Sequence, residues 1–135
     1  MYSKSALTLA DAKQIAAAAE AEALKNKWAV TIAVLDDGGN LLFLQRLDDA
    51  PLGSIAVAQE KARTSLLFKR PTKAIEEIVA GGRIVMLTLP GATPIEGGLP
   101  LLNKGQIIGA IGVSGVQSSQ DAQIAGAGVE IAATL

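Results

Sequence analysis

Apolar side chains recur every three or four residues along the first part of the chain. Between Thr8 and Lys27 they fall at Ala12, Ile15, Ala16, Ala19 and Ala23. This spacing predicts a helix with one narrow face made almost entirely of alanine. Thr8 and Asp11 are spaced as a capping box, which places the start of the helix there.

The pattern then changes to an almost unbroken apolar run. Trp28–Leu35 is rich in β-branched residues and predicts a buried strand. The residues Asp36-Asp-Gly-Gly-Asn40 are typical of a turn, and Leu41–Leu44, continuing to Gln45-Arg46, begins a second strand. Together the two strands predict a first β-hairpin.

The middle of the chain predicts two helices and a strand. Leu52 to Phe68 has the composition of a helix, and Pro71 would end it. Thr72–Ala80 predicts a second, shorter helix, which Gly81-Gly82 would end. Arg83–Leu89 is apolar and partly β-branched, and Pro90 follows it. We interpret this segment as a third strand.

The stretch from Gly97 to Gly115 predicts a second hairpin. Two apolar runs, Leu99–Leu102 and Gln106–Val113, flank the polar break Asn103-Lys104-Gly105. Glycines 109, 112 and 115 would weaken a strand, which indicates close approach of another backbone or of a ligand.

A C-terminal helix completes the predicted order α-β-β-α-α-β-β-β-α. Ser118-Ser-Gln-Asp121 is spaced as a second capping box, and the residues after it are rich in Ala, Ile and Val. The order is typical of an α+β fold built on a mostly antiparallel sheet. The length and the absence of a linker predict a single domain over residues 1–135.

Composition narrows the possible functions. The chain is 50% hydrophobic but 3% aromatic, with a net charge of −1, so it offers neither a basic surface nor a stacking platform for nucleic acid. No apolar run approaches the ~18 residues of a membrane span, and no signal sequence is evident. Cysteine is absent, which fits a cytoplasmic location.

Histidine is also absent, which removes the commonest general base and transition-metal ligand. We therefore expect no metal site, no Ser-His catalysis and no cofactor. Acid–base chemistry would have to rely on carboxylates, Lys, Arg or Tyr2.

Three groups of polar residues are candidates for a functional site. The first is Arg46 with Asp48 and Asp49, the second is Lys61 and Thr64 on the central helix, and the third is Glu96, Gly97 and Gly98 with Ser114 and Asp121. Arginine can clamp a carboxylate, lysine supplies a point charge, and backbone N–H groups of a Gly-rich loop can bind an anion.

Each group also has a plain structural interpretation. Arg46 and Asp48 could form an ion pair, Lys61 could lie on a solvated helix face, and Ser114 and Asp121 could act only in a turn and a helix cap.

Several of these segments together resemble the GlcG/HbpS family. The resemblance rests on Val30-Thr-Ile-Ala-Val-Leu-Asp36, Gly39-Asn-Leu41, Arg46-Leu-Asp-Asp-Ala50, Ala58-Gln-Glu-Lys-Ala62-x-Thr64, Gly97-Gly-Leu-Pro100, Ile108-Gly-Ala-Ile-Gly-Val-Ser-Gly115 and Asp121. It implies a profilin-like fold with a five-stranded antiparallel sheet flanked by helices. It also implies a homo-oligomer, from a dimer up to an octamer, and relatives that include a haem-binding sensor protein and a corrinoid adenosyltransferase domain.

The chain departs from the family pattern in two ways. Haem binding in the family depends on a histidine, which this chain lacks, so the resemblance gives haem little support here. Met86, in a segment predicted to be a buried strand, and Tyr2, near the N-terminus, are poor substitutes. Asp49 stands where the family usually has Gly, and it adds a second carboxylate beside Asp48.

Two functional hypotheses follow. In the first, the protein is a binding or accessory protein in the catabolism of a small organic compound, with a ligand held by Arg46, Lys61, Thr64, Gly97, Gly98 and Ser114. In the second, it is a cofactor-free isomerase, lyase or hydrolase acting on a small carboxylate or carbonyl compound. Arg46 would then orient the substrate, Asp48, Asp49 or Glu96 would move a proton, and the Gly97–Gly98 N–H groups would hold an oxyanion.

Overall fold

The computed structural model describes all residues, 1–135. Its helices and strands are α1 (Leu9–Lys25), β1 (Thr31–Asp36), β2 (Leu41–Arg46), α2 (Ser54–Leu67), α3 (Thr72–Ala80), the 3₁₀ helix η1 (Ile84–Thr88), β3 (Gly98–Asn103), β4 (Gln106–Ser114) and α4 (Ser118–Ala132). The α+β fold class is confirmed, and the predicted bounds of α3 are reproduced residue for residue.

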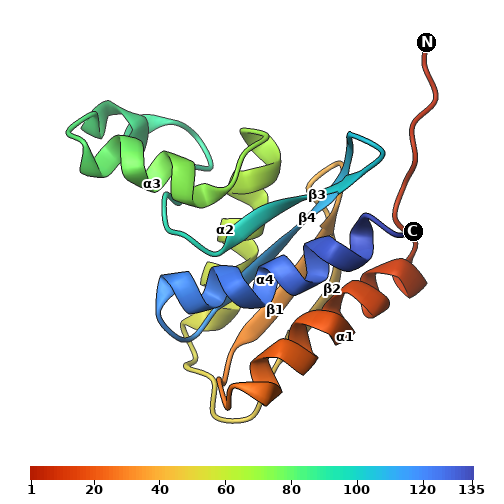
Figure 1. The fold of residues 1–135 in the computed structure, drawn as a ribbon. Helices are drawn as coiled ribbons and strands as arrows, with labels where there is room; N and C mark the ends of the chain where they lie inside the picture. The colour runs from red at the N-terminus through yellow and green to blue at the C-terminus, as the bar shows by residue number, and fades with distance from the viewer.

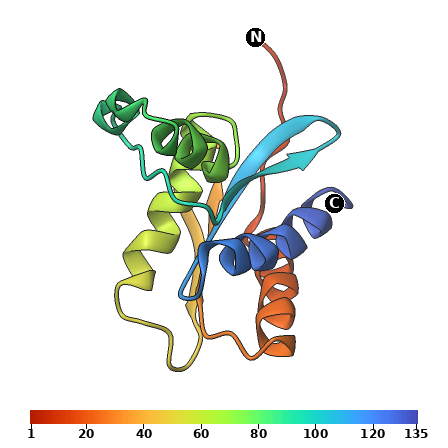
Figure 2. The same cartoon turned by 60° about the vertical axis from the view of Figure 1, so that its left-hand side comes forward.

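Four antiparallel strands form one sheet in the order β2-β1-β4-β3. Helix α2 covers one face of the sheet, and α1 and α4 lie side by side on the other face (Figure 1 and Figure 2). The two hairpins of the chain therefore meet through their inner strands, β1 and β4.

The start of α1 follows the sequence signal. The Thr8 N–H donates to Asp11 Oδ2 at 2.9 Å, and the Asp11 N–H donates to Thr8 Oγ1 at 3.1 Å, which confirms the predicted capping box. None of the four α-helices combines the length and apolar character that a membrane crossing requires.

The larger part of the core lies between the sheet and the α1/α4 layer. Its members are aliphatic and mostly inaccessible to solvent, among them Ile15, Ile32, Val34, Ile111, Val113 and Ile124. A smaller cluster under α2 consists of Leu35, Ala62 and Ala110. Ile32 and Val34 of β1 belong to the larger cluster and Leu35 to the smaller one, so the strand contributes side chains to both faces of the sheet.

Helix α2 lies unusually close to the sheet because β4 presents a glycine to it. A Cβ atom at Gly112 would stand 1.9 Å from the Ala58 carbonyl oxygen and 2.6 Å from the Ala62 nitrogen. The interpretation of the inner glycines as close-packing positions is therefore confirmed at Gly112, whose neighbour is the backbone of a helix.

The fifth strand predicted at Arg83–Leu89 is wrong. Its residues Ile84–Thr88 form η1, on an arm made of α3, η1 and the loop that returns to β3, here called the arm (residues 72–95). The arm projects away from the sheet (Figure 2). β-propensity stabilises a strand only where a neighbouring strand can pair with it, and the nearest edge strand, β3, contains Pro100, which offers no N–H.

Two glycines of α4 give a matched test of this packing. A Cβ at Gly126 would meet nothing within 4 Å, whereas one at Gly128 would lie 2.7 Å from Ile111 Cδ1 and 3.0 Å from Ile15 Cγ2. We expect Gly126→Ala to raise the free energy of unfolding by about 0.5–1 kcal/mol through helix propensity. Gly128→Ala should lower it by about 1–2 kcal/mol through overpacking. Urea denaturation measures both, and equal stabilisation by the two changes would contradict the packing described.

Candidate functional site

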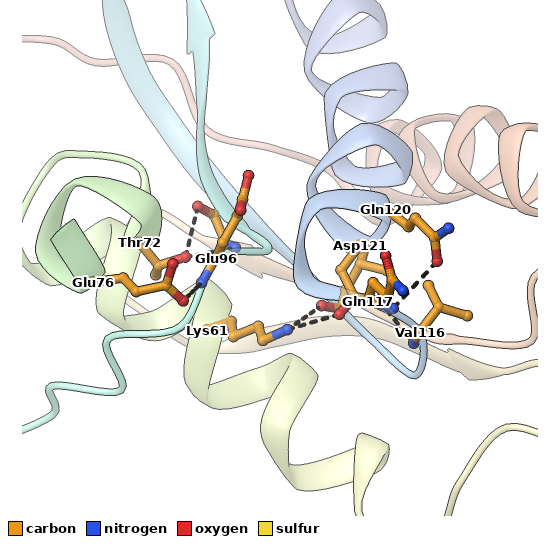
Figure 3. Close-up of polar contacts among 10 residues, drawn as sticks. Lys61, Thr72, Glu76, Glu96, Val116, Gln117, Gln120 and Asp121 are labelled. Carbon is orange, nitrogen blue, oxygen red and sulfur yellow. Dashed lines mark hydrogen bonds and ion pairs between the residues drawn. The ribbon is translucent and has the colours of Figure 1, made fainter. Parts of the chain in front are cut away.

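Lys61 is the most deeply buried charged side chain of α2. It is 2% exposed, and its Nζ donates to Asp121 Oδ2 at 3.0 Å and to the Val113 carbonyl at 3.0 Å (Figure 3). The interpretation of Lys61 as part of a solvated helix face is therefore wrong. A buried ammonium needs an ion partner and hydrogen bonds of this kind, because its desolvation is costly.

Asp121, a candidate of the third predicted group, is the ion partner of Lys61, a pairing that the sequence does not predict. Its side chain is 2% exposed, and Oδ1 accepts a hydrogen bond from the Val116 N–H at 3.2 Å. Burial raises the pKa of the Asp121 carboxyl above its usual range, and the hydrogen bond from Lys61 opposes that rise. The pair ties α2 to the end of β4 and to the first turn of α4.

The predicted capping box at Ser118–Asp121 is displaced by one residue. Gln117 is the N-cap of α4, and its N–H donates to the Gln120 side chain at 3.3 Å. Asp121 consequently lies one position further into the helix than predicted and faces Lys61 across the end of the sheet (Figure 3).

The Gly97–Gly98 pair packs against the middle of α2, beside this ion pair. A Cβ at Gly98 would stand 2.1 Å from the Lys61 carbonyl oxygen, and one at Gly97 would stand 2.8 Å from Lys61 Nζ. The Gly98 N–H donates to Thr72 Oγ1 at 2.9 Å, and the Gly97 carbonyl accepts from the Val113 N–H at 3.0 Å. The Gly98 N–H is thus already engaged, rather than pointing at an open site.

Thr64, also predicted to bind ligand, is inaccessible to solvent. Its hydroxyl lies 2.7 Å from the Gly91 carbonyl oxygen and accepts from the Thr93 N–H at 2.9 Å. Thr64 therefore fastens the returning loop of the arm to α2.

Glu96 is half-buried at the end of the same loop. Its N–H donates to the Glu76 carboxylate at 3.2 Å (Figure 3). Its charge also contributes a small rise to the pKa of Asp121. The structure therefore brings Lys61, Thr64, Glu96, Gly97 and Gly98 to one region, here called the junction, together with Asp121.

Arg46 lies outside the junction, at the opposite edge of the sheet. It ends β2 and pairs in register with Thr31, which in turn pairs with Ser114 on β4. Three strand spacings separate β2 from β3, or about 14 Å between backbones. Arg46 and Glu96 therefore lie on elements at opposite edges of the sheet, and no ion pair joins them. The arrangement does not favour the enzymatic hypothesis, in which they act on one small substrate as a clamp and a base.

Asp48 and Asp49 follow Arg46 in an exposed turn and form no ion pair with it. Asp49 has a φ of 68°, which is a left-handed conformation. Glycine adopts this conformation most readily, and Asn and Asp adopt it more readily than the other residue types. The glycine that the family usually has here and the aspartate of this chain both suit this backbone. The two carboxylates line a shallow groove of about 360 Å³ beside Trp28.

Two further grooves lie where no candidate was predicted, between the C-terminal end of α2 and the β3–β4 hairpin. The first, of about 550 Å³, is lined by Tyr2, Lys4, Leu66, Leu67 and the hairpin turn, among others. The second, of about 270 Å³, is lined mainly by Leu99, Pro100, Leu102, Ile107 and Val129, with Arg70 and Pro71 at one side. Lys69 and Ile107 line both, so we treat the two as one feature, the joined groove.

Two unpaired cations line the joined groove. Lys4 in the larger part forms an ion pair with Asp37 at 2.6 Å, and this hydrogen bond raises the pKa of Lys4. Lys69 and Arg70 have no carboxylate within ion-pair distance, and both are exposed. The joined groove thus combines the apolar lining of its smaller part with two uncompensated cations, of which Lys69 lines both parts.

Donors for a metal or for haem iron are scarce. No group of three or more His, Cys, Asp or Glu residues is placed to hold a metal ion. Haem iron takes His, Cys, Met or Tyr as its axial ligand. Met86 lies on the arm, and Tyr2, which lines the larger part of the joined groove, is 86% exposed. The structure therefore presents no buried axial ligand, and its residues do not fit a haem iron held from within the protein.

Comparison with known proteins places this arrangement in a family. The family model described as "Haem degrading protein HbpS-like" matches residues 7–130. Protein GlcG of Escherichia coli K12 is 50% identical over 114 residues, which are 84% of this chain and 85% of GlcG.

Solved structures agree with the sequence match. The Klebsiella pneumoniae protein ORFY superposes with a TM-score of 0.90 at 34% identity, covering 99% of this chain and 96% of ORFY. The haem complex of PduOC superposes with a TM-score of 0.84 at 27% identity, covering 94% of this chain and 95% of PduOC. The chain therefore belongs to the HbpS-like family, of which GlcG is a member.

Proposed function

We propose that this protein binds a small organic anion, with the charged group of the ligand at Lys69 and its apolar body in the joined groove. The observation that carries the proposal is the unpaired ammonium of Lys69 at the point where the two grooves meet. A carboxylate is the simplest partner for such a group.

The lining of the smaller groove supports an apolar ligand body. Leu99, Leu102, Ile107 and Val129 come from β3, β4 and α4, so the lining is fixed by the fold rather than by a flexible loop. Each methylene of a ligand that leaves water here contributes about 0.8 kcal/mol. A volume of about 270 Å³ suits a short aliphatic or single-ring body.

The relatives support the same chemical class. PduOC was crystallised with haem, and the family description names haem degradation. Haem is itself an apolar molecule with carboxylate groups. A small apolar carboxylate in the joined groove would therefore belong to the same chemical class of ligand as the haem bound by PduOC. The role expected from the family resemblance, an accessory protein in the catabolism of a small organic compound, is part of this proposal.

Most of the residues that the sequence predicts to bind the ligand have a structural role in this proposal. Lys61, Thr64, Gly97 and Gly98 are held by contacts within the protein, and we assign them to the frame that fixes β3 and the arm. Arg46 ends β2, and Ser114 lies at the opposite end of β4 from Ile107, so neither is given a contact with the ligand.

Octanoate and benzoate are suitable probes, with octanol and benzamide as uncharged counterparts. We expect calorimetric titration to show binding of at least one of the two acids and weaker binding of its counterpart. Lys69→Gln should weaken acid binding about tenfold, because a charge-assisted hydrogen bond is worth about 1.5–3 kcal/mol. Lys27→Gln is the matched control, since Lys27 also follows a helix with a positive φ, 58° against 54° for Lys69.

Haem is tested in the same series. A Soret maximum that moves away from the position of free haem when the protein is added, and that lies elsewhere again in Tyr2→Phe, would show iron ligation by this chain and would replace the proposal. Equal affinity of Lys69→Gln and the unchanged protein for the acids would also contradict it.

A further inference from the structure

Four exposed apolar side chains follow one another closely along the arm. In η1, Ile84 is 68% exposed, Val85 54% and Leu87 53%, and Leu89 follows at 37%. No residue of η1 is buried. Scattered apolar residues are ordinary on protein surfaces, but a contiguous group marks an interaction site. These four residues are here called the η1 patch.

The η1 patch continues onto the body of the protein. A Cβ at Gly91, in the loop that returns from η1, would lie 2.7 Å from Leu67 Cδ1, so this loop packs beside the last residue of α2. Leu67 is 47% exposed. The apolar surface therefore runs from η1 to the end of α2.

Hydrogen bonds from buried threonines fasten both ends of the arm to the body of the protein. The Thr64 hydroxyl binds the backbone at Gly91 and Thr93, and the Thr72 hydroxyl accepts from the Gly98 N–H. Both threonine side chains are inaccessible to solvent. An apolar surface that is already ordered loses little conformational entropy when a partner covers it.

Charge indicates what kind of partner fits. The twelve residues from Ile84 to Ile95 include no charged side chain. Over this segment, two identical copies can therefore meet without like-charge repulsion and without burying a charge. An anionic membrane would instead call for a cluster of basic residues around the patch, whereas α3 carries one lysine and two glutamates.

We propose that a second copy of this chain covers the η1 patch in a two-fold arrangement, in which the patch of each copy contacts the patch of the other. In a two-fold contact the same surface is used on both sides, which suits a neutral, self-complementary patch. A stable interface buries about 800 Å² per partner, so the contact must extend from η1 onto α3 and Leu67. The homo-oligomer expected from the family resemblance thus acquires a specific interface.

Size-exclusion chromatography with light scattering tests this directly. We expect the unchanged protein to have at least twice the mass of one chain, and Leu87→Asp to have a smaller mass with unchanged circular dichroism. Leu52→Asp is the control, because Leu52 is 77% exposed but lies outside the arm. A monomeric unchanged protein, or a Leu87→Asp variant that keeps the full mass, would overturn the proposal.

A second variant tests the same interface by crosslinking, without placing a charge in the η1 patch. The chain contains no cysteine, so a single cysteine introduced by Val85→Cys can pair only with its counterpart in another copy. We expect Val85→Cys to form a disulfide-linked dimer under mild oxidation and Leu52→Cys to form none. Equal crosslinking of the two variants would refute the interface. Binding of octanoate or benzoate at Lys69 is measured separately. Failure of the crosslinking or mass experiments would overturn the interface and leave the proposed function untouched, whereas failure of acid binding would overturn the proposed function and leave the interface untouched.

Discussion

Replacing Lys61 by Met should lower the free energy of unfolding by about 3–5 kcal/mol near neutral pH. Methionine has a similar length, but it leaves Asp121 buried with its charge uncompensated. The loss should come from the stranded carboxylate rather than from packing. Urea denaturation of the unchanged and substituted proteins measures it.

The dependence of this loss on pH identifies its cause. Without Lys61, the rise that burial causes in the pKa of Asp121 is opposed only by the hydrogen bond from the Val116 N–H, so the pKa rises further. A carboxyl whose pKa is raised by folding contributes stability below its unfolded pKa, and that contribution is lost as the pH rises through the folded value. The deficit of Lys61→Met should therefore be smallest near pH 4 and should grow toward neutral pH.

A double variant provides the control. Lys61→Met combined with Asp121→Asn removes both charges and retains an acceptor for the Val116 N–H. Its stability should lie well above that of Lys61→Met at neutral pH and should lack the added pH dependence. A double variant that is no more stable than Lys61→Met would show that the loss arises from packing.

Gly112→Ala should lower the free energy of unfolding by about 3 kcal/mol. The added Cβ would stand 1.9 Å from the Ala58 carbonyl oxygen, and a helix backbone cannot yield as the end of a side chain can. The result should be a separation of α2 from the sheet, visible as a lower midpoint in urea.

Gly53→Ala is the control for this change. A Cβ there would meet nothing within 4 Å and the position has no positive φ, so its effect should stay within about 1 kcal/mol. An unfolding midpoint for Gly112→Ala as high as that of Gly53→Ala would contradict the close approach of α2.

Local signals in the sequence were sufficient for most of the elements. The capping box at Thr8 and Asp11 is present in the structure, and Pro71 with Gly81 delimits α3 as expected. These signals act within a few residues, so no tertiary information is needed to interpret them. The segment Ile84–Thr88 has strand-like residues but no strand to pair with, and pairing is a property of the whole sheet.

The candidate site was harder to predict because its residues are distant in sequence. Lys61 and Asp121 are sixty positions apart and meet only because α2 and α4 converge at one end of the sheet. The joined groove is assembled from the end of α2, the β3–β4 hairpin and α4. Asp121 was among the predicted candidates, but nothing local indicates that Lys61 is its partner, and nothing local distinguishes Lys69 from any other surface lysine.

Mapping the amide resonances of the protein during titration with octanoate or benzoate tests the central claim most directly. The account predicts that the largest shifts fall at Lys69, Ile107 and Val129, and that they weaken in Lys69→Gln. Shifts centred instead on Arg46, Ser114 and Gly97, or no shifts with either acid, would contradict it.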